Sequence, residues 1–278
     1  MMALETLSEH RSFGGVQGFY RHASRACAGP MRFGLYRPPG GSNGVLYFLA
    51  GLTCTEEIFA IKAGAQRLAA ESSLVVVTPD TSPRDTGIPG ATGDWEFGEG
   101  AGFYLDATEA PWSARFRTET WIVDELPSVL ADEFRIERDR TGICGHSMGG
   151  HGALTLALRH PDRYASVSAL APIVAPARVP WGEKAFSRYL GNDRRRWAEH
   201  DACELVARQV FPGKILVDQG EADPFLAKQL QPELFEAACA AAGQSLQLRR
   251  HAHYDHSYYF VASLIGEHLH HHAAVLAA

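Results

Sequence analysis

A glycine-rich stretch near the middle of the chain, residues 142–154, holds residue types that suit nucleophilic catalysis. It contains one Gly-x-Ser-x-Gly pentapeptide, Gly145 to Gly149, centred on Ser147. The residues before Ser147 are typical of a short buried strand, and those after it carry apolar side chains at helical spacing. A tight turn between a strand and a helix is a nucleophile elbow, which lifts a serine hydroxyl clear of the backbone. The pentapeptide alone also arises by chance in glycine-rich chains, but this context favours Ser147 as a nucleophile.

Two backbone N–H groups are expected near Ser147 to stabilise a negatively charged oxygen. One belongs to Met148, at the start of the helix, where the positive end of the helix dipole points to the same place. The second should come from residues 50–53, the loop that follows an apolar strand at 45–49. Gly51 lets that loop turn sharply toward a substrate. Together these donors would form an oxyanion hole.

A serine hydroxyl is a poor nucleophile, so it needs a base within hydrogen-bond reach and a third group that orients the base. In α/β-hydrolases these partners follow the serine in the order acid, then histidine. Residues 215–225 offer Asp218, Glu221 and Asp223. We favour Asp223, because Asp218 is expected within a strand whereas Asp223 precedes a helix and is free to face a histidine. The alternative role of Asp223 is to cap that helix, with Pro224 at the first helical position.

The base should lie between the last strand and the last helix. His251, His253 and His256 all qualify by position, and spacing does not choose among them. Asp255 is adjacent to the last of these histidines, and adjacent side chains on a turn diverge. We therefore expect Asp255 to cap the last helix and not to orient the base.

Strands and helices alternate along most of the chain. Residues 13–37 predict two antiparallel strands joined near Ala28-Gly29-Pro30. The later strands are expected at 45–49, 74–77, directly before Ser147, 166–170, 214–217 and 246–248, and the helices at 57–72, 118–133, directly after Ser147, 225–242 and 257–274. This alternation predicts an α/β fold, the α/β-hydrolase fold, with a mostly parallel central sheet and helices on both faces. No linker or repeat divides it, so a single domain over residues 1–278 is expected.

Two long segments, 79–117 and 172–200, fit neither a strand nor a helix. Loops of this length are usually functional or contain short helices, and both should emerge on the same side of the sheet as Ser147. Their aromatic residues could line an acyl or leaving-group pocket, although ordinary packing is the alternative for each: Trp95, Phe97, Phe103, Tyr104 and Trp181.

The composition is that of an ordinary globular protein. A net charge of −6 over 278 residues argues against a nucleic-acid or anionic-membrane surface. No apolar run is long enough to cross a membrane, and the N-terminus does not resemble a signal peptide, so a cytoplasmic protein is expected.

The cysteines and histidines do not indicate a disulfide frame or a metal site. The cysteines are odd in number and contain no C-x-x-C pair, a pattern typical of free thiols in a reducing compartment: Cys27, Cys54, Cys144, Cys203 and Cys239. The run His268, His270, His271 and His272 continues the last helix and has no carboxylate or thiol at ligand spacing. No metal is expected there.

Short segments in a fixed order carry a family resemblance: 51–56, 79–84, 100–104, 145–154, 171–173, 180–182, 218–220 and 254–260. From about residue 45 to the C-terminus the chain resembles the S-formylglutathione hydrolase family, also called esterase D. The resemblance implies Ser147, Asp223 and His256 as the catalytic triad, and the N–H groups of Leu52 and Met148 as the oxyanion hole. The family usually has glycine at the position of His253, and residues 85–94 also diverge from it.

The resemblance further implies hydrolysis of the thioester S-formylglutathione to formate and glutathione, which completes glutathione-dependent formaldehyde removal. Short-chain esters would be side substrates, no cofactor would be used, and the protein would be a cytoplasmic homodimer. A general short-chain carboxylesterase or an acyltransferase of the same fold is the alternative, and a catalytically silent binding protein is a rival of another class. We place Cys54, Trp95, His146 and Trp181 in the candidate substrate pocket; Cys54 matches a family cysteine near the active site and could instead be a small buried filler.

Overall fold

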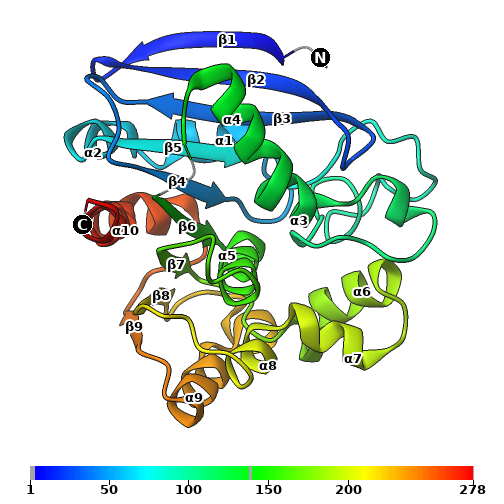
Figure 1. The fold of residues 1–278 in the computed structure, drawn as a ribbon. Helices are drawn as coiled ribbons and strands as arrows, with labels where there is room; N and C mark the ends of the chain where they lie inside the picture. The colour runs from blue at the N-terminus through cyan, green and yellow to red at the C-terminus, as the bar shows by residue number, and fades with distance from the viewer. Residues whose placement is uncertain (1–3, 138–139, 278) are drawn as a thin grey trace.

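A sheet of nine strands forms the centre of the computed structural model, which describes residues 4–137 and 140–277 (Figure 1). The strand order is β1-β2-β3-β5-β4-β6-β7-β8-β9. The strands are β1 (Leu4–Ser12), β2 (Gly15–Ser24), β3 (Gly29–Arg37), β4 (Gly44–Leu49), β5 (Leu74–Pro79), β6 (Thr141–His146), β7 (Ser166–Leu170), β8 (Ile215–Gly220) and β9 (Leu246–His251).

Most of this sheet is parallel, as predicted. The pairs β1–β2, β2–β3 and β3–β5 are antiparallel, whereas the pairs from β5 through β4 to β9 are all parallel. Every residue of β4 to β8 is buried, as expected for strands covered by helices on both faces. The register pairs His146 with Leu170 and Leu170 with Asp218, so the carboxyl ends of neighbouring strands meet at one edge.

Helices cover both faces of the sheet (Figure 1). One face carries α1 (Glu56–Lys62), α2 (Gln66–Glu71) and α10 (Tyr258–Leu276). The other carries α3 (Thr118–Thr120), a π-helical turn (Trp121–Glu125), α4 (Leu126–Phe134), α5 (Met148–Arg159), α8 (Ala202–Val206) and α9 (Pro232–Ala242). The α/β architecture with helices on both faces is therefore confirmed.

Three local predictions were incomplete. The helix expected at 57–72 is divided into α1 and α2 around Gly64, whose φ of 67° is outside the helical region. The helix expected at 225–242 is a π-helical turn (Leu226–Leu230) and α9, separated where Gln231 has a φ of 47°. The edge strand β1 was missed because its residues are mostly exposed and polar.

The two long segments differ in kind. Residues 79–117 are mainly irregular, with one short 3-10 turn (Trp112–Ala114), whereas 172–200 contains two 3-10 turns (Pro176–Arg178 and Ala198–His200), α6 (Pro180–Tyr189) and α7 (Arg194–Trp197). Four of the aromatic residues considered for a pocket are buried in the core: Phe97, Phe103, Tyr104 and Trp181. Within residues 4–137 and 140–277, no helix is long and apolar enough to span a membrane.

The cysteines form no disulfides, and two histidines of the C-terminal run form hydrogen bonds to strands of the sheet. All five cysteines are free, and only Cys54 is not fully buried. In α10 both ring nitrogens of His272 lie 2.6 and 2.8 Å from the hydroxyls of Ser166 and Ser168, and His268 Nε2 lies 2.8 Å from Asp218. These contacts join the helix to the strands beneath it. The described residues contain no group of three or more His, Cys, Asp or Glu side chains arranged to hold a metal ion.

Candidate active site

Ser147 occupies a strained turn between β6 and α5. Its φ of 59° and ψ of −120° lie outside the regions that most residues adopt, as a nucleophile elbow requires. The turn depends on Gly149, because a Cβ atom there would lie only 1.9 Å from the carbonyl oxygen of Leu49 in β4. The start of α5 can therefore approach β4 only with glycine at this position. Ser147 is held at the carboxyl end of β6, as the sequence predicts.

Asp223 and His256 are joined by a short hydrogen bond. His256 Nδ1 lies 2.5 Å from Asp223 Oδ2, and the Asp223 side chain is fully buried. The other carboxylate oxygen accepts the backbone N–H of Phe225 at 2.8 Å. One oxygen thus fixes the following turn, and the other faces a histidine. The alternative role, a helix cap with Pro224 at the first helical position, was wrong, because the π-helical turn begins at Leu226 and its cap residue is Phe225, with no side-chain cap bond. With Nδ1 engaged by the carboxylate, Nε2 of His256 is the nitrogen left to act as a base.

The second candidate acid and one of the other candidate bases form a separate pair. Asp218 lies within β8, as predicted, and its carboxylate is 2.8 Å from His251 Nε2 and 2.8 Å from His268 Nε2. It also accepts two hydrogen bonds from Arg249. Burial alone would raise the pKa of Asp218, but hydrogen bonds from His268 and Arg249 hold this pKa well below its usual range. Through these hydrogen bonds Asp218 joins β8, β9 and α10.

Among the described residues, the side chains of the remaining candidates form no hydrogen bond or ion pair with those of Asp223 or His256. Glu221 is exposed, and His253 is exposed with a φ of 69°. Asp255 was expected to be the cap of α10, and this prediction was wrong: the cap is Ser257, whose hydroxyl accepts the N–H of Tyr259. Asp255 instead accepts hydrogen bonds from the N–H and the hydroxyl of Ser257, because it lies too early in the chain to reach the helix.

The loop after β4, residues 50–55, lies against Ser147; we call it the oxyanion loop after the role that the sequence predicts for it. A Cβ atom on Gly51 would be 3.2 Å from Ser147 Cβ. The N–H groups of Thr53 and Cys54 donate to the carbonyls of Gly100 and Gly51, whereas that of Leu52 has no acceptor in the described part of the chain. Met148 begins α5, and first-turn N–H groups have no acceptor within their own helix. The assignment of the Leu52 and Met148 N–H groups as the two oxyanion donors stays a prediction, and both groups lack a backbone acceptor in the described part of the chain.

The chain matches the family model Esterase, described as "Putative esterase", over residues 24–271. It is 48% identical over 275 residues to an S-formylglutathione hydrolase of Paracoccus denitrificans (strain Pd 1222), covering 98% of each chain. An S-formylglutathione hydrolase of Mus musculus is 47% identical over 284 residues, covering 100% of both chains. The chain belongs to the S-formylglutathione hydrolase family.

A solved structure of an S-formylglutathione hydrolase from Agrobacterium tumefaciens is similar over nearly the whole chain. Its TM-score is 0.95 at 46% sequence identity, covering 98% of this chain and 99% of that one. The predicted family and the predicted α/β-hydrolase fold are therefore both confirmed.

In this esterase a row of aromatic rings leads from the imidazole of His256 toward the surface. The ring of Phe225 lies edge-on at 5.0 Å from His256, that of Trp181 is 4.7 Å from Phe225, and that of Trp95 is 5.5 Å from Trp181. Trp181 is buried, whereas Trp95 is 52% exposed. Two of the predicted pocket residues thus form the outer part of this row. Sequence reasoning missed Phe225, although it directly follows Asp223-Pro224.

His146, another predicted pocket residue, packs against His256. Its ring centroid is 4.6 Å from that of His256, and only 4% of the residue is exposed. Burial, together with the nearby His256, lowers the pKa of His146 well below its usual value, and the carbonyl of His256 opposes this shift. Neither ring nitrogen of His146 has a hydrogen-bond partner that meets the usual distance and angle limits among the described residues. A neutral imidazole therefore packs against that of His256.

Cys54, the last predicted pocket residue, is part of the oxyanion loop. It is partly exposed, and burial raises the pKa of its thiol. Its side chain is therefore protonated at neutral pH, and a reactive thiolate is disfavoured.

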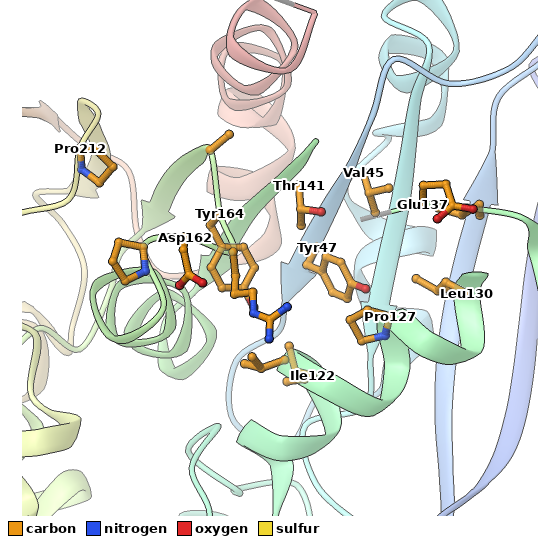
Figure 2. A pocket seen from close by; sticks show the side chains of 15 residues that line it. Val45, Tyr47, Ile122, Pro127, Leu130, Glu137, Thr141, Asp162, Tyr164 and Pro212 are labelled. Atoms are coloured by element: carbon orange, nitrogen blue, oxygen red, sulfur yellow. The ribbon is translucent and has the colours of Figure 1, made fainter. Parts of the chain in front are cut away.

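A cavity of about 580 Å³ lies at the other end of the sheet (Figure 2). Val45 and Thr141, near the amino ends of β4 and β6, form part of its wall. Ile122 from the π-helical turn and Leu130 from α4 also line it. Ser147 follows the carboxyl end of β6, so this cavity is separated from the nucleophile by the length of the strand. It is not part of the candidate active site.

Replacing His253 by glycine is expected to stabilise the fold by about 1 kcal/mol. His253 has a φ of 69°, where a side chain is strained and glycine is not. The measurement is urea unfolding of His253→Gly beside His253→Ala, which removes the imidazole but keeps the Cβ atom. The alanine variant should gain nothing. If the two variants are equally stable, backbone strain at this position is not the cause.

Proposed function

We propose that this chain is a serine hydrolase that cleaves S-formylglutathione to formate and glutathione. The observation that carries the proposal is the 2.5 Å contact between Asp223 and His256, at the edge of the sheet where the elbow holds Ser147. The relatives from Paracoccus denitrificans and Mus musculus, similar over their full lengths, support the choice of thioester. The reaction would complete glutathione-dependent removal of formaldehyde.

The first half of the reaction transfers the formyl group to the enzyme. His256 Nε2 takes the proton of Ser147 as Oγ bonds to the formyl carbon, and Asp223 stabilises the imidazolium that results. The carbonyl oxygen becomes an oxyanion, which accepts hydrogen bonds from the N–H groups of Leu52 and Met148. Collapse of this intermediate breaks the C–S bond, and the glutathione sulfur leaves with the proton from His256.

The second half regenerates the enzyme with water. His256, neutral again, takes a proton from a water molecule as the water oxygen attacks the formyl carbon. The same two N–H groups bind the second oxyanion. The bond between Ser147 Oγ and the formyl carbon then breaks, Oγ receives the proton from His256, and formate leaves. No cofactor takes part in either half.

A formyl group needs little room, so we propose a narrow acyl side and a wider leaving-group side. The catalytic efficiency should then fall by roughly tenfold for each methylene added to the acyl chain, because an enclosed site rejects the extra volume. The measurement is kcat/KM for S-formylglutathione and for p-nitrophenyl acetate, butyrate and hexanoate. Equal efficiency across the esters, with S-formylglutathione no better than acetate, would favour a general carboxylesterase.

The same substrates distinguish a hydrolase from an acyltransferase and from a silent binding protein. An acyltransferase would release p-nitrophenol faster when an acceptor alcohol is added, whereas a hydrolase would not. A catalytically silent binding protein would hydrolyse none of the substrates and would not react with a fluorophosphonate probe.

We also propose that the chain acts as one catalytic domain in the cytoplasm and forms a homodimer. One continuous sheet supports a single domain, and the free cysteines suit a reducing compartment. Light scattering of the purified protein tests the dimer; a mass equal to that of one chain at micromolar concentration would refute it.

A further inference from the structure

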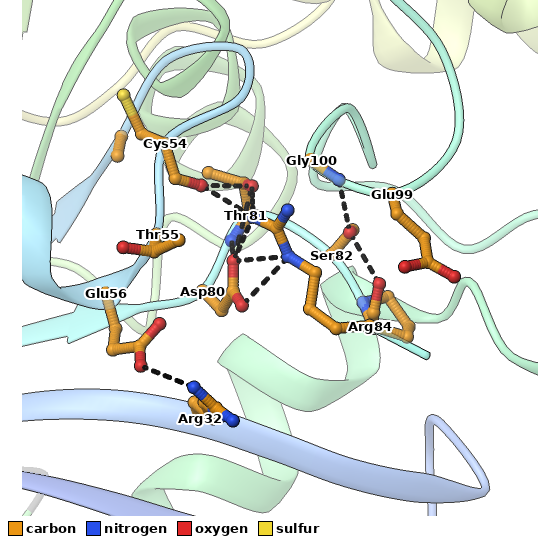
Figure 3. A network of polar contacts seen from close by, with 12 residues as sticks. Arg32, Cys54, Thr55, Glu56, Asp80, Thr81, Ser82, Arg84, Glu99 and Gly100 are labelled. Carbon is orange, nitrogen blue, oxygen red and sulfur yellow. Dashed lines mark hydrogen bonds and ion pairs between the residues drawn. The ribbon is translucent and has the colours of Figure 1, made fainter. Parts of the chain in front are cut away.

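The oxyanion loop is held by side chains from a segment that follows β5. The carbonyl oxygen of Cys54 accepts a hydrogen bond from Arg84 Nη2 at 2.7 Å and another from Thr81 Oγ1 at 2.8 Å (Figure 3). The bond from the guanidinium is charge-assisted, so it is stronger than a bond between neutral groups. The peptide group at the end of the loop is therefore fixed from outside the loop.

Arg84 is itself held by a buried carboxylate. Asp80, directly after β5, is 2% exposed and accepts hydrogen bonds from both Arg84 Nη2, at 2.7 Å, and Arg84 Nε, at 3.1 Å. The N–H of Thr81 donates to the same carboxylate at 2.7 Å. This fork-like pairing sets the plane of the guanidinium, and Figure 3 shows Arg84 lying between Asp80 and the Cys54 carbonyl.

A second contact chain reaches the middle of the same loop. Thr53 has a φ of 68°, and its N–H donates to Gly100 O at 2.8 Å. The N–H of Gly100 donates in turn to Ser82 Oγ at 2.7 Å (Figure 3). Residues 80–84 thus hold the loop at two residues, Thr53 and Cys54. Leu52 directly precedes Thr53.

The positive charge of Arg84 is what balances the buried carboxylates beside the oxyanion loop. Glu56, the first residue of α1, is buried beside Asp80, and burial together with the Asp80 carboxylate raises the pKa of Glu56 to about 7. Arg32 is 4.0 Å from Glu56 but is 46% exposed, and among the described residues no hydrogen bond joins it to Cys54, whereas Arg84 donates to the Cys54 carbonyl. Arg84 is therefore the cation that both neutralises Asp80 and reaches the oxyanion loop.

We propose that Arg84, oriented by Asp80, is a positioning residue that holds the oxyanion loop so that the Leu52 N–H faces the developing oxyanion. The inference rests on the proposed function, because it gives the loop a catalytic purpose. An N–H group that is already fixed before the reaction stabilises the transition state without the cost of reorganisation. A loosened loop would bind substrate almost as well and would stabilise the oxyanion less.

The test compares Arg84→Ala, Arg84→Lys and the control Arg32→Ala with p-nitrophenyl acetate, counting active sites by fluorophosphonate titration. Arg84→Ala should lose roughly tenfold to a hundredfold in kcat per active site, less than the full loss of an oxyanion donor, with KM nearly unchanged. Arg84→Lys should recover part of the rate, and guanidinium at millimolar concentration should partly restore Arg84→Ala. Arg32→Ala should stay within about twofold of the unmodified protein.

A second readout separates positioning from a general loss of structure. A trifluoromethyl ketone forms a tetrahedral adduct whose negative oxygen occupies the oxyanion hole, so its affinity should fall by the same factor as kcat/KM. Thr81→Val covers the case in which Arg84→Ala does not fold. It removes the bond from the Thr81 hydroxyl to the Cys54 carbonyl and the longer contacts of that hydroxyl with Arg84 and Asp80, but keeps the Arg84 guanidinium, and it should show a smaller parallel loss in both quantities.

Unchanged kcat per active site and unchanged ketone affinity in Arg84→Ala, or in Thr81→Val if the former does not fold, would overturn the proposal. So would losses confined to the number of active sites. If the unmodified protein neither hydrolyses the ester nor reacts with the probe, it is the proposed function that fails, and the two failures are therefore distinguishable.

Discussion

Ser147→Ala is expected to lower kcat by about 10⁶-fold, the largest effect of any substitution considered, because no other group replaces the attacking oxygen. The residual rate would come from binding and from the Leu52 and Met148 donors. The measurement is steady-state hydrolysis of S-formylglutathione, with circular dichroism to confirm that the variant is folded. Loss of the hydroxyl removes no hydrogen bond found in the described structure, so the stability should change little.

A matched control is Ser263→Ala. Ser263 is exposed on α10, and its hydroxyl donates only to the carbonyl of Tyr259. This variant should keep the full rate. If Ser147→Ala retains more than a few per cent of the activity while folded, then Ser147 is not the nucleophile.

Asp223→Asn should lower kcat with little change in stability, whereas Asp218→Asn should lower stability with little change in kcat. The amide at position 223 would hold His256 in the wrong tautomer, and we expect kcat to fall by roughly 10⁴-fold with little change in stability. At position 218 the loss of the carboxylate leaves Arg249 without its buried partner. This change should cost roughly 3 kcal/mol of stability while kcat per active site stays near that of the unmodified protein.

Both variants are measured by active-site-normalised kinetics and by urea unfolding at the same pH. The two variants can be compared directly, because the two aspartates are close in the chain and each contacts one candidate base. Asp218 contacts His251, and Asp223 contacts His256. If Asp218→Asn were the variant that lost catalysis, His251 and not His256 would be the base.

The fold could be predicted where apolar residues form unbroken runs. Strands β4 to β8 are fully buried. Unbroken apolar runs identified β4 and β5, whereas the elbow around Ser147 identified β6 and the alternation of strands with helices predicted the parallel part of the sheet. The breaks at Gly64 and Gln231 were not readable, because each depends on one backbone φ that the surrounding helical pattern conceals. The strand β1 was missed for a different reason: it is an exposed edge strand, so its side chains carry no apolar pattern.

The sequence predicted which residue types form the candidate site, but it did not predict which histidine pairs with which carboxylate. The motif around Ser147 identifies the elbow because its glycines are required by local geometry. Spacing could not choose among His251, His253 and His256, since the choice depends on which carboxylate each one meets across the sheet. The contact from Arg84 to the carbonyl of Cys54 leaves no sequence signal at all, because a backbone acceptor is the same in every residue.

The measurement that tests the central claim most directly is the site of covalent labelling by a fluorophosphonate, determined by peptide mass spectrometry. We predict a single modified residue, Ser147, labelled rapidly in the unmodified protein and far more slowly in His256→Ala and Asp223→Asn. A label on any other residue, or equal labelling rates in the three proteins, would contradict the account.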